Sequence, residues 1–250
     1  MACNRLETMR MTGSGLIVAH RGVTGPAYEN TTAAFEAAIR LGADLVECDL
    51  RRTADGCYLI HHDLTVGRAA IARCTSSEVR KKGRALGYEI PTLDELLEVI
   101  SGRIGLDLEL KEEGYEVATV NYLLKRTSPD RFVITSFHPG SIKTLKACFP
   151  EVRCGILLAK PSSRGRLRTA DEPSRRLTGI RQLKADFVAA HWKHLQLGAF
   201  PGKLVHGLPI WVWTVNERSA LERCLTEKRV EAVITDKVEL ALAVRDGDAL

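Results

Sequence analysis

The sequence has no hydrophobic run long enough to cross a membrane. No stretch approaches the ~18 consecutive apolar residues that a bilayer-spanning helix requires. The opening segment, MACNRLETMRMTGSG, contains no apolar stretch of the length found in secretory signal peptides. We therefore expect a cytoplasmic protein that is not exported and that makes no stable membrane insertion.

Patterned cysteines and strong net charge are also missing. The seven cysteines are scattered, and no CxxC pair occurs among them, which is typical of reduced thiols in a cytosol rather than of a disulfide framework. The formal net charge is only +5. This mild excess favours a small anionic ligand over nucleic acid, so we expect no nucleic-acid partner. Nothing in the sequence indicates the oligomeric state.

Internal repeats and interdomain linkers are absent, and short apolar runs alternate with amphipathic segments. The runs typical of strands lie at 16–19, 45–50, 58–61, 104–110, 132–136, 153–158, 186–190, 209–215 and 231–235. Helical patterns lie between most of them, and the residues expected to cap helix starts are Thr31 or Thr32, Thr92, Ser141 and Asn216.

This alternation over 250 residues is typical of an α/β protein with a TIM (β/α)8 barrel. A doubly wound open sheet is the alternative architecture. We expect one barrel domain at residues 15–250, preceded by a disordered tail at 1–14. Residues 64–90, after the second strand, are expected to form a small insertion over the barrel mouth.

Polar side chains gather at the ends of the first expected strands. They are His20 and Arg21, then Glu47 and Asp49, then His61, His62 and Asp63, and finally Asp107, Glu109 and Lys111. In the last group the charged residues alternate with leucines, so the leucine face packs on outer helices and the charged face points into the lumen. TIM barrels carry their functional groups at the carboxyl ends of strands, so this pattern predicts a site there.

Glu47, Asp49 and Glu109 form the acidic part of this predicted site. Three carboxylates near one barrel mouth repel each other, by about 1 to 4 kcal/mol per pair at ~4 Å. A divalent cation would remove that repulsion, and all-oxygen ligands favour Mg²⁺ or Ca²⁺ over zinc. The alternative is that ion pairs with neighbouring basic side chains balance the carboxylates, the candidates being Arg51, Arg52 and Lys111.

His20 and His62 form a pair that can divide acid and base roles near neutral pH. A lone histidine is more often structural, but two at neighbouring strand ends beside carboxylates favour catalysis. Arg21 and Lys111 supply positive charge suited to a phosphate. The residues therefore suggest metal-assisted acid–base chemistry on an anionic ester, most naturally a phosphodiester.

Seven short motifs, in order along residues 16–240, resemble the glycerophosphodiester phosphodiesterase family. They are AHRG at 19–22, ENT at 29–31, ECD at 47–49, HD at 62–63, ELK at 109–111, WTVN at 213–216 and VITD at 233–236. The resemblance implies a β/α barrel and metal-dependent hydrolysis of glycerophosphodiesters to sn-glycerol 3-phosphate and an alcohol. A lysophospholipase D type of enzyme, which would admit an acyl chain, and a non-catalytic binding barrel are the alternatives.

The resemblance also implies roles for individual residues. His20 and His62 are the acid/base pair, Arg21 and Lys111 bind the phosphate, Phe137 and Trp213 line the glycerol pocket, and Glu47, Asp49 and Glu109 hold the metal. Glu29 and Asn30 either cap the following helix or orient the first-strand residues or the metal. His62 is preferred over His61 because the family motif is His-Asp, and Asp63 is expected to fix His62.

Two segments depart from the family pattern. LTVGRAA at 64–70 differs from the usual continuation after His-Asp. Residues 160–184 contain eight Lys or Arg against two acidic residues. This segment is expected to be either a solvated loop or a basic rim that draws anionic substrates to the catalytic face, in which case neutralising its arginines raises KM.

Overall fold

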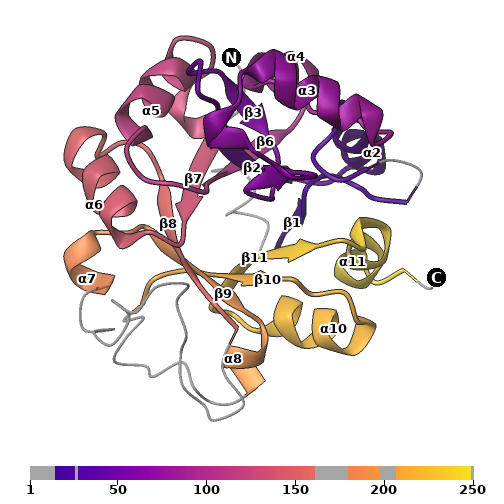
Figure 1. Ribbon diagram of the computed structural model, residues 1–250. Helices are drawn as coiled ribbons and strands as arrows, with labels where there is room; N and C mark the ends of the chain where they lie inside the picture. Colours follow the sequence, from indigo (N-terminus) through magenta and orange to yellow (C-terminus); the bar gives the residue numbers. More distant parts are fainter. Residues whose placement is uncertain (1–14, 26–27, 161–179, 197–206, 249–250) are drawn as a thin grey trace.

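The computed structural model describes residues 15–25, 28–160, 180–196 and 207–248 (Figure 1). The tail expected at 1–14 and most of the basic segment 160–184 lie outside these ranges. Eight parallel strands stand at the centre: β1 (Leu16–Ala19), β2 (Leu45–Arg52), β6 (Gly105–Leu110), β7 (Phe132–Ser136), β8 (Cys154–Leu158), β9 (Phe187–His191), β10 (Ile210–Trp213) and β11 (Val230–Thr235). Because β1 pairs with both β2 and β11, the sheet closes into a barrel. The predicted TIM barrel is confirmed.

Helices surround the strands on the outside of the barrel (Figure 1). They are α2 (Thr32–Leu41), α4 (Leu93–Ile100), α5 (Glu116–Leu124), α6 (Pro139–Cys148), α7 (Ile180–Leu183), α8 (Lys193–Gln196), α10 (Arg218–Thr226) and α11 (Val238–Asp246). A short η2 turn (Pro129–Arg131) leads into β7. Within the described ranges, none of the helices has the length and hydrophobicity that crossing a bilayer demands.

The predicted helix caps are partly confirmed. Thr31 and Thr92 cap α2 and α4, because each hydroxyl accepts a hydrogen bond from a first-turn backbone N–H. The predictions for Ser141 and Asn216 are wrong. Ser141 lies inside α6 and its hydroxyl donates to Glu116, and Asn216 binds the strand end of β11 instead. A short polar side chain beside a helix start can satisfy other partners, which sequence spacing does not reveal.

The two faces of each barrel strand contribute to different cores. On β6, Leu106, Leu108 and Leu110 join the large core between barrel and helices, as the alternation predicts. The lumen has its own apolar core, which includes Leu16, Val18, Leu45, Val133, Phe187 and Trp211. Asp107 and Glu109, on the other face of β6, line a cavity above this lumen core. The fold therefore presents the charged face of β6 to an internal site.

The segment between β2 and α4 contains the predicted insertion. It comprises β3 (Tyr58–Ile60), the β4–β5 hairpin (Thr65–Val66 and Ala69–Ala70), η1 (Ile71–Arg73) and α3 (Ser76–Ala85). A small apolar cluster of its own, with Val66, Val79 and Ile90 fully buried, packs the insertion together. The run expected as a strand at 58–61 is not part of the barrel wall, because β3 pairs antiparallel with the end of β2.

Candidate active site

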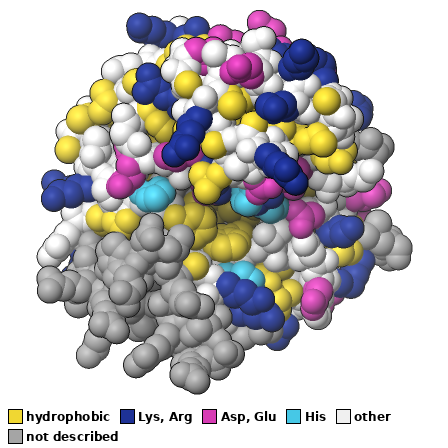
Figure 2. Space-filling view, viewed as in Figure 1, with side chains coloured by type: hydrophobic (Ala, Val, Ile, Leu, Met, Phe, Trp, Pro, Cys, Tyr) yellow, Lys and Arg dark blue, Asp and Glu magenta, His cyan; other side chains and the backbone are white. Residues whose placement is uncertain are grey.

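A cavity of about 250 Å³ opens at the carboxyl ends of the barrel strands. Figure 2 shows the hollow at the centre of this face, with hydrophobic side chains inside it and histidines at its rim. Seven of the ten polar strand-end groups expected from the sequence line this cavity, and Asp49, His61 and Asp63 do not. The described residues that line it are His20, Arg21, Glu47, His62, Asp107, Glu109, Lys111, Thr135, Phe137, Leu157, Trp213, Thr214 and Ile234.

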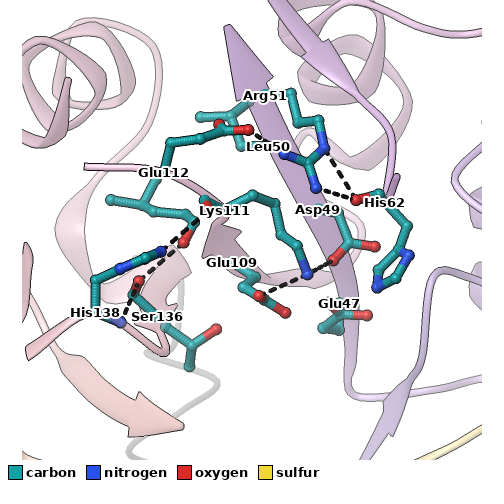
Figure 3. Close-up of polar contacts among 12 residues, drawn as sticks. Glu47, Asp49, Leu50, Arg51, His62, Glu109, Lys111, Glu112, Ser136 and His138 are labelled. Atoms are coloured by element: carbon teal, nitrogen blue, oxygen red, sulfur yellow. Dashed lines mark hydrogen bonds and ion pairs between the residues drawn. The ribbon is translucent and has the colours of Figure 1, made fainter. Parts of the chain in front are cut away.

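Three buried carboxylates meet at one side of this cavity. One oxygen from each of Glu47, Asp49 and Glu109 lies within 4.8 Å of the others. They are brought together because β2 and β6 are neighbouring parallel strands, with Asp49 opposite Glu109 in the register. Figure 3 shows the carboxylates converging from the two strands. The three residues predicted as metal ligands therefore form one compact group.

The pKa values of the three carboxyls differ because their positive neighbours differ. Burial, followed by the charges of the other acidic groups, raises the pKa of Glu47 well above its usual range. Burial also raises the pKa of Glu109 to about 7. Burial opposes the ionisation of Asp49 too, but Lys111 and Arg21 outweigh it and lower its pKa to about 2. The group thus carries more carboxyls than its nearby cations balance.

Lys111 and Arg21 are the cations that contact this group. Lys111 Nζ lies 2.7 Å from Glu109 Oε1 and 3.2 Å from Asp49 Oδ1, and Figure 3 shows it between the two carboxylates. Arg21 Nε lies 3.1 Å from Asp49 Oδ2, and the Arg21 backbone N–H donates to Glu47 Oε2 at 2.9 Å. Both cations therefore adjoin the acidic group and face the cavity.

Arg51, considered from the sequence as a counter-ion of the carboxylates, has other partners. Its guanidinium pairs with Glu112 and donates to the backbone carbonyl of His62. Figure 3 shows that both contacts are separate from the contacts of Lys111 with the carboxylates. Arg51 therefore ties the start of the insertion to β2 and does not neutralise the acidic group.

The loop after β1 holds Asp49 and Arg21 in place. Asn30 Nδ2 donates to Asp49 Oδ2 at 2.8 Å, and the Asp49 backbone N–H donates to Asn30 Oδ1 at 3.3 Å. Glu29 Oε1 accepts from the Arg21 guanidinium at 2.9 Å. Since the α2 cap is Thr31, the side chains of Glu29 and Asn30 serve these contacts instead. Arg21 and Asn30 adopt left-handed backbone angles, φ 55° and 57°, which cost free energy in non-glycine residues.

His20 is fixed by an acidic side chain from the last strand end. Its Nδ1 lies 2.6 Å from Asp236 Oδ1, and Asn216 Nδ2 donates to Asp236 Oδ2 at 2.6 Å. Burial opposes the ionisation of Asp236, but the hydrogen bond and charge of His20, the hydrogen bond from Asn216 and the charge of Arg21 together outweigh it and lower the Asp236 pKa. An ionised carboxylate only accepts, so the His20 proton belongs on Nδ1, and Nε2 is the nitrogen available for chemistry.

Asp236 and Asn216 were not among the predicted site residues. They lie in the VITD and WTVN motifs, which carried the family resemblance, but Asn216 was expected only to cap a helix and Asp236 was given no role. The signal that could have found Asp236 is its place directly after β11, the strand that pairs with β1 beside His20. A polar residue at that strand end lies next to the end of β1 in a closed barrel.

His62 lies on the insertion side of the cavity. Its Nδ1 is 2.8 Å from Asp63 Oδ1, which assigns its free nitrogen as Nε2 by the same reasoning. Burial lowers the pKa of His62, and the charge of Asp49 opposes that effect. The neighbouring His61 stacks on Tyr88, with 6.2 Å between ring centroids, and does not line the cavity. The structure thus brings His20 and His62, but not His61, to the carboxylate group.

The opposite wall of the cavity is apolar. Phe137 and Trp213 meet edge to face with 5.8 Å between ring centroids, and both pack against the lumen core. Leu157 and Ile234 extend this wall. The cavity is therefore charged on the side of β2 and β6 and apolar on the other, which suits a ligand with an anionic group and a carbon skeleton.

A family model for the glycerophosphoryl diester phosphodiesterase family matches residues 20–240. The chain belongs to this family. The prediction of a phosphodiesterase-family enzyme, made from the ordered motifs, is confirmed.

Similar curated proteins and solved structures span nearly the whole chain. A glycerophosphodiester phosphodiesterase of Caldanaerobacter subterraneus is 27% identical over 93% of this chain and 98% of its own length. A crystal structure of a glycerophosphodiester phosphodiesterase from Parabacteroides distasonis shares the fold at 23% identity and a TM-score of 0.78, covering 93% of this chain and 97% of its own. An Oleispira antarctica phosphodiesterase, solved in complex with the product sn-glycerol-3-phosphate, is 27% identical with a TM-score of 0.75, covering 94% and 98%.

Proposed function

We propose that the protein hydrolyses glycerophosphodiesters to sn-glycerol 3-phosphate and an alcohol, with Mg²⁺ or Ca²⁺ as cofactor. The observation that carries this proposal is one cavity lined by two histidines, two cations and two members, Glu47 and Glu109, of a buried group of three carboxylates. Family membership and the product bound by the Oleispira relative support it. The expected cytoplasmic location stays a prediction.

The carboxylate group fits a hard divalent cation. Glu47, Asp49 and Glu109 offer oxygen ligands only, and a divalent cation would compensate the charge of all three carboxylates, which the two neighbouring cations do not balance. These three residues would hold the ion. When bound, it supplies Lewis-acid stabilisation of the negative charge on the phosphoryl oxygens.

Arg21 and Lys111 bind the phosphate. Both face the cavity beside the carboxylates, so their charges attract an anionic ester and stabilise charge that develops at phosphorus. Glu29 and Asn30 position Arg21 and Asp49 through the contacts of the β1 loop. Phe137 and Trp213 pack against the glycerol carbons on the apolar side.

His20 and His62 transfer the protons. Each has its Nδ1 hydrogen-bonded to an aspartate, Asp236 or Asp63, and each therefore presents Nε2 to the substrate. One imidazole takes the proton of the attacking oxygen, and the other gives a proton to the departing alkoxide. The attacking oxygen comes from water or from the 2-hydroxyl of the glycerol moiety. Attack by the 2-hydroxyl forms a cyclic phosphate intermediate, which water then hydrolyses.

The test is release of sn-glycerol 3-phosphate from glycerophosphocholine with Mg²⁺, with Ca²⁺ or with EDTA. We expect activity with at least one of the two ions and none with EDTA. Turnover of lysophosphatidylcholine in the same assay tests the lysophospholipase D alternative. Full activity in EDTA would overturn the metal-dependent mechanism, and preferential turnover of lysophosphatidylcholine would overturn the proposed substrate.

A further inference from the structure

Asp107 is a buried carboxyl in the cavity wall, and one of its oxygens has no partner. The residue is 1% exposed and lines the cavity. Thr135 Oγ1 donates to Asp107 Oδ1 at 2.8 Å, whereas Oδ2 receives no hydrogen bond from the residues that the structure describes. Buried polar atoms are nearly always hydrogen-bonded in folded proteins. Oδ2 is therefore an acceptor suited to a donor that enters the cavity.

Asp107 lies opposite the predicted metal ligand Glu47 in the register of β2 and β6, but it is not a member of the metal-ligand group. It precedes Glu109 by two residues on β6, so it lies on the same face but roughly 6–7 Å deeper in the barrel. Among the described residues, the one set of three side chains that could share an ion is Glu47, Asp49 and Glu109, which excludes Asp107. Its free oxygen is placed for a different ligand.

The surroundings of Asp107 select the kind of ligand. The cavity is also lined by Leu157, Ile234 and Trp213, which belong to or pack against the apolar lumen core. Asp107 and its partner Thr135 are polar groups on the β6–β7 side of this lining, with Glu47 next to Asp107 on β2. A compact ligand whose far end carries a hydroxyl would satisfy the acceptor and leave its carbons against the apolar wall.

We propose that Asp107 accepts a hydrogen bond from the terminal hydroxyl of the glycerol moiety and thereby selects glycerol esters. This inference rests on the proposed function. The terminal hydroxyl is the polar group of glycerol farthest from phosphorus. When Arg21 and Lys111 bind the phosphate beside Glu109, this hydroxyl lies one layer of side chains deeper in the barrel. That is the depth of Asp107. The alcohol on the other side of phosphorus then points to the open mouth.

A polar site of this kind discriminates strongly against a ligand that lacks the hydroxyl. Without that donor, binding the ligand buries the Asp107 oxygen with no partner, which weakens affinity. The missing hydroxyl therefore lowers affinity only while the carboxylate is present. A variant without the carboxylate is expected to lose the preference and not simply to bind everything more weakly.

The experiment compares two ligands by calorimetry on the metal-loaded protein. One ligand is sn-glycerol 3-phosphate, and the other is propane-1,2-diol 1-phosphate, which lacks only the terminal hydroxyl. We expect the unmodified protein to prefer sn-glycerol 3-phosphate by roughly 10- to 100-fold, the cost of leaving one buried acceptor without a partner. Asp107→Ala is expected to bind both ligands with similar affinity. Thr135→Val, which removes the contact to Oδ1 and leaves Oδ2 in place, is expected to keep most of the preference.

The outcomes separate this inference from the proposed function. If the unmodified protein binds sn-glycerol 3-phosphate no more tightly than inorganic phosphate, both fail. If it binds and hydrolyses as proposed but Asp107→Ala retains the preference, only the role of Asp107 is overturned. A lowered affinity of Asp107→Ala for the metal, with the ligand preference intact, overturns it as well. Should Asp107→Ala not fold, the isosteric Asp107→Asn gives the same comparison, with a reduced preference expected.

Discussion

His20 Nδ1 lies 2.6 Å from Asp236 Oδ1, so the first strand end is tied to the last one across the closure of the barrel. The carboxylate fixes the ring orientation and keeps the proton on Nδ1. We expect Asp236→Asn to lower kcat by about 100- to 10,000-fold, the usual range for one acid–base group, with little change in KM. Steady-state kinetics with glycerophosphocholine measure the two parameters separately.

Asn216→Ala is the matched control for Asp236→Asn. It removes the hydrogen bond to Asp236 Oδ2 and the two that Asn216 Oδ1 accepts from the Asp236 N–H and from Thr235 Oγ1, and it leaves the pair between His20 and Asp236 in place. We expect a decrease in kcat of about 10-fold, smaller than for Asp236→Asn, because the carboxylate that orients His20 is still present. Equal losses in the two variants would indicate that the strand end is merely disrupted, and would contradict a positioning role for Asp236.

The adjacent histidines His61 and His62 provide a second comparison. His62 lines the cavity, whereas His61 stacks on Tyr88 outside it. We expect His62→Ala to lower kcat by about 100-fold or more and His61→Ala to change it by less than about 3-fold. Thermal melting of both variants tells whether the fold is retained. A comparable loss of kcat in His61→Ala would mean that the wrong ring has been assigned.

The sequence predicted the barrel because its two periodicities are local: strand runs and helix patterns alternate within short windows. It also identified the face of β6, since leucines and charged residues alternate there. The partners of His20 and Asp107 were not predictable in the same way. Asp236 and Thr135 are distant from them in sequence, and only the closure and register of the sheet bring each pair together.

Stabilisation of the protein by a divalent cation is expected to increase with pH. In the metal-free protein the pKa of Glu109 is raised from 4.5 to about 7, and that of Glu47 is raised as well. Between pH 4.5 and about pH 7 the folded state binds more protons than the unfolded chain. The metal-free protein therefore loses stability as the pH rises through this range. A cation competes with those protons.

Melting temperatures with EDTA and with excess Mg²⁺ or Ca²⁺ test this at about pH 5.5 and about pH 8. The rise in Tm on adding metal should be larger, by several degrees, at the higher pH. Glu109→Gln removes one titrating ligand, so the rise should be smaller and depend less on pH in that variant. A metal-induced rise that is the same at both pH values would rule out the carboxylate group as the binding site.

Variants of Asn30 and Thr31 distinguish the two possible roles of the loop that follows Arg21, which are to position Asp49 and to cap α2. Asn30 exchanges two hydrogen bonds with Asp49, whereas Thr31 caps α2 through its hydroxyl. We expect Asn30→Ala to weaken metal affinity by about 10- to 100-fold, as removal of a group that orients a ligand does. Thr31→Ala should lower the free energy of unfolding by about 1 kcal/mol and leave metal affinity nearly unchanged. Metal titrations by calorimetry and urea unfolding of both variants measure the two effects.

If Asn30→Ala lost stability but kept its metal affinity, the side chain would serve the loop alone, and the link between this loop and the metal site would be wrong.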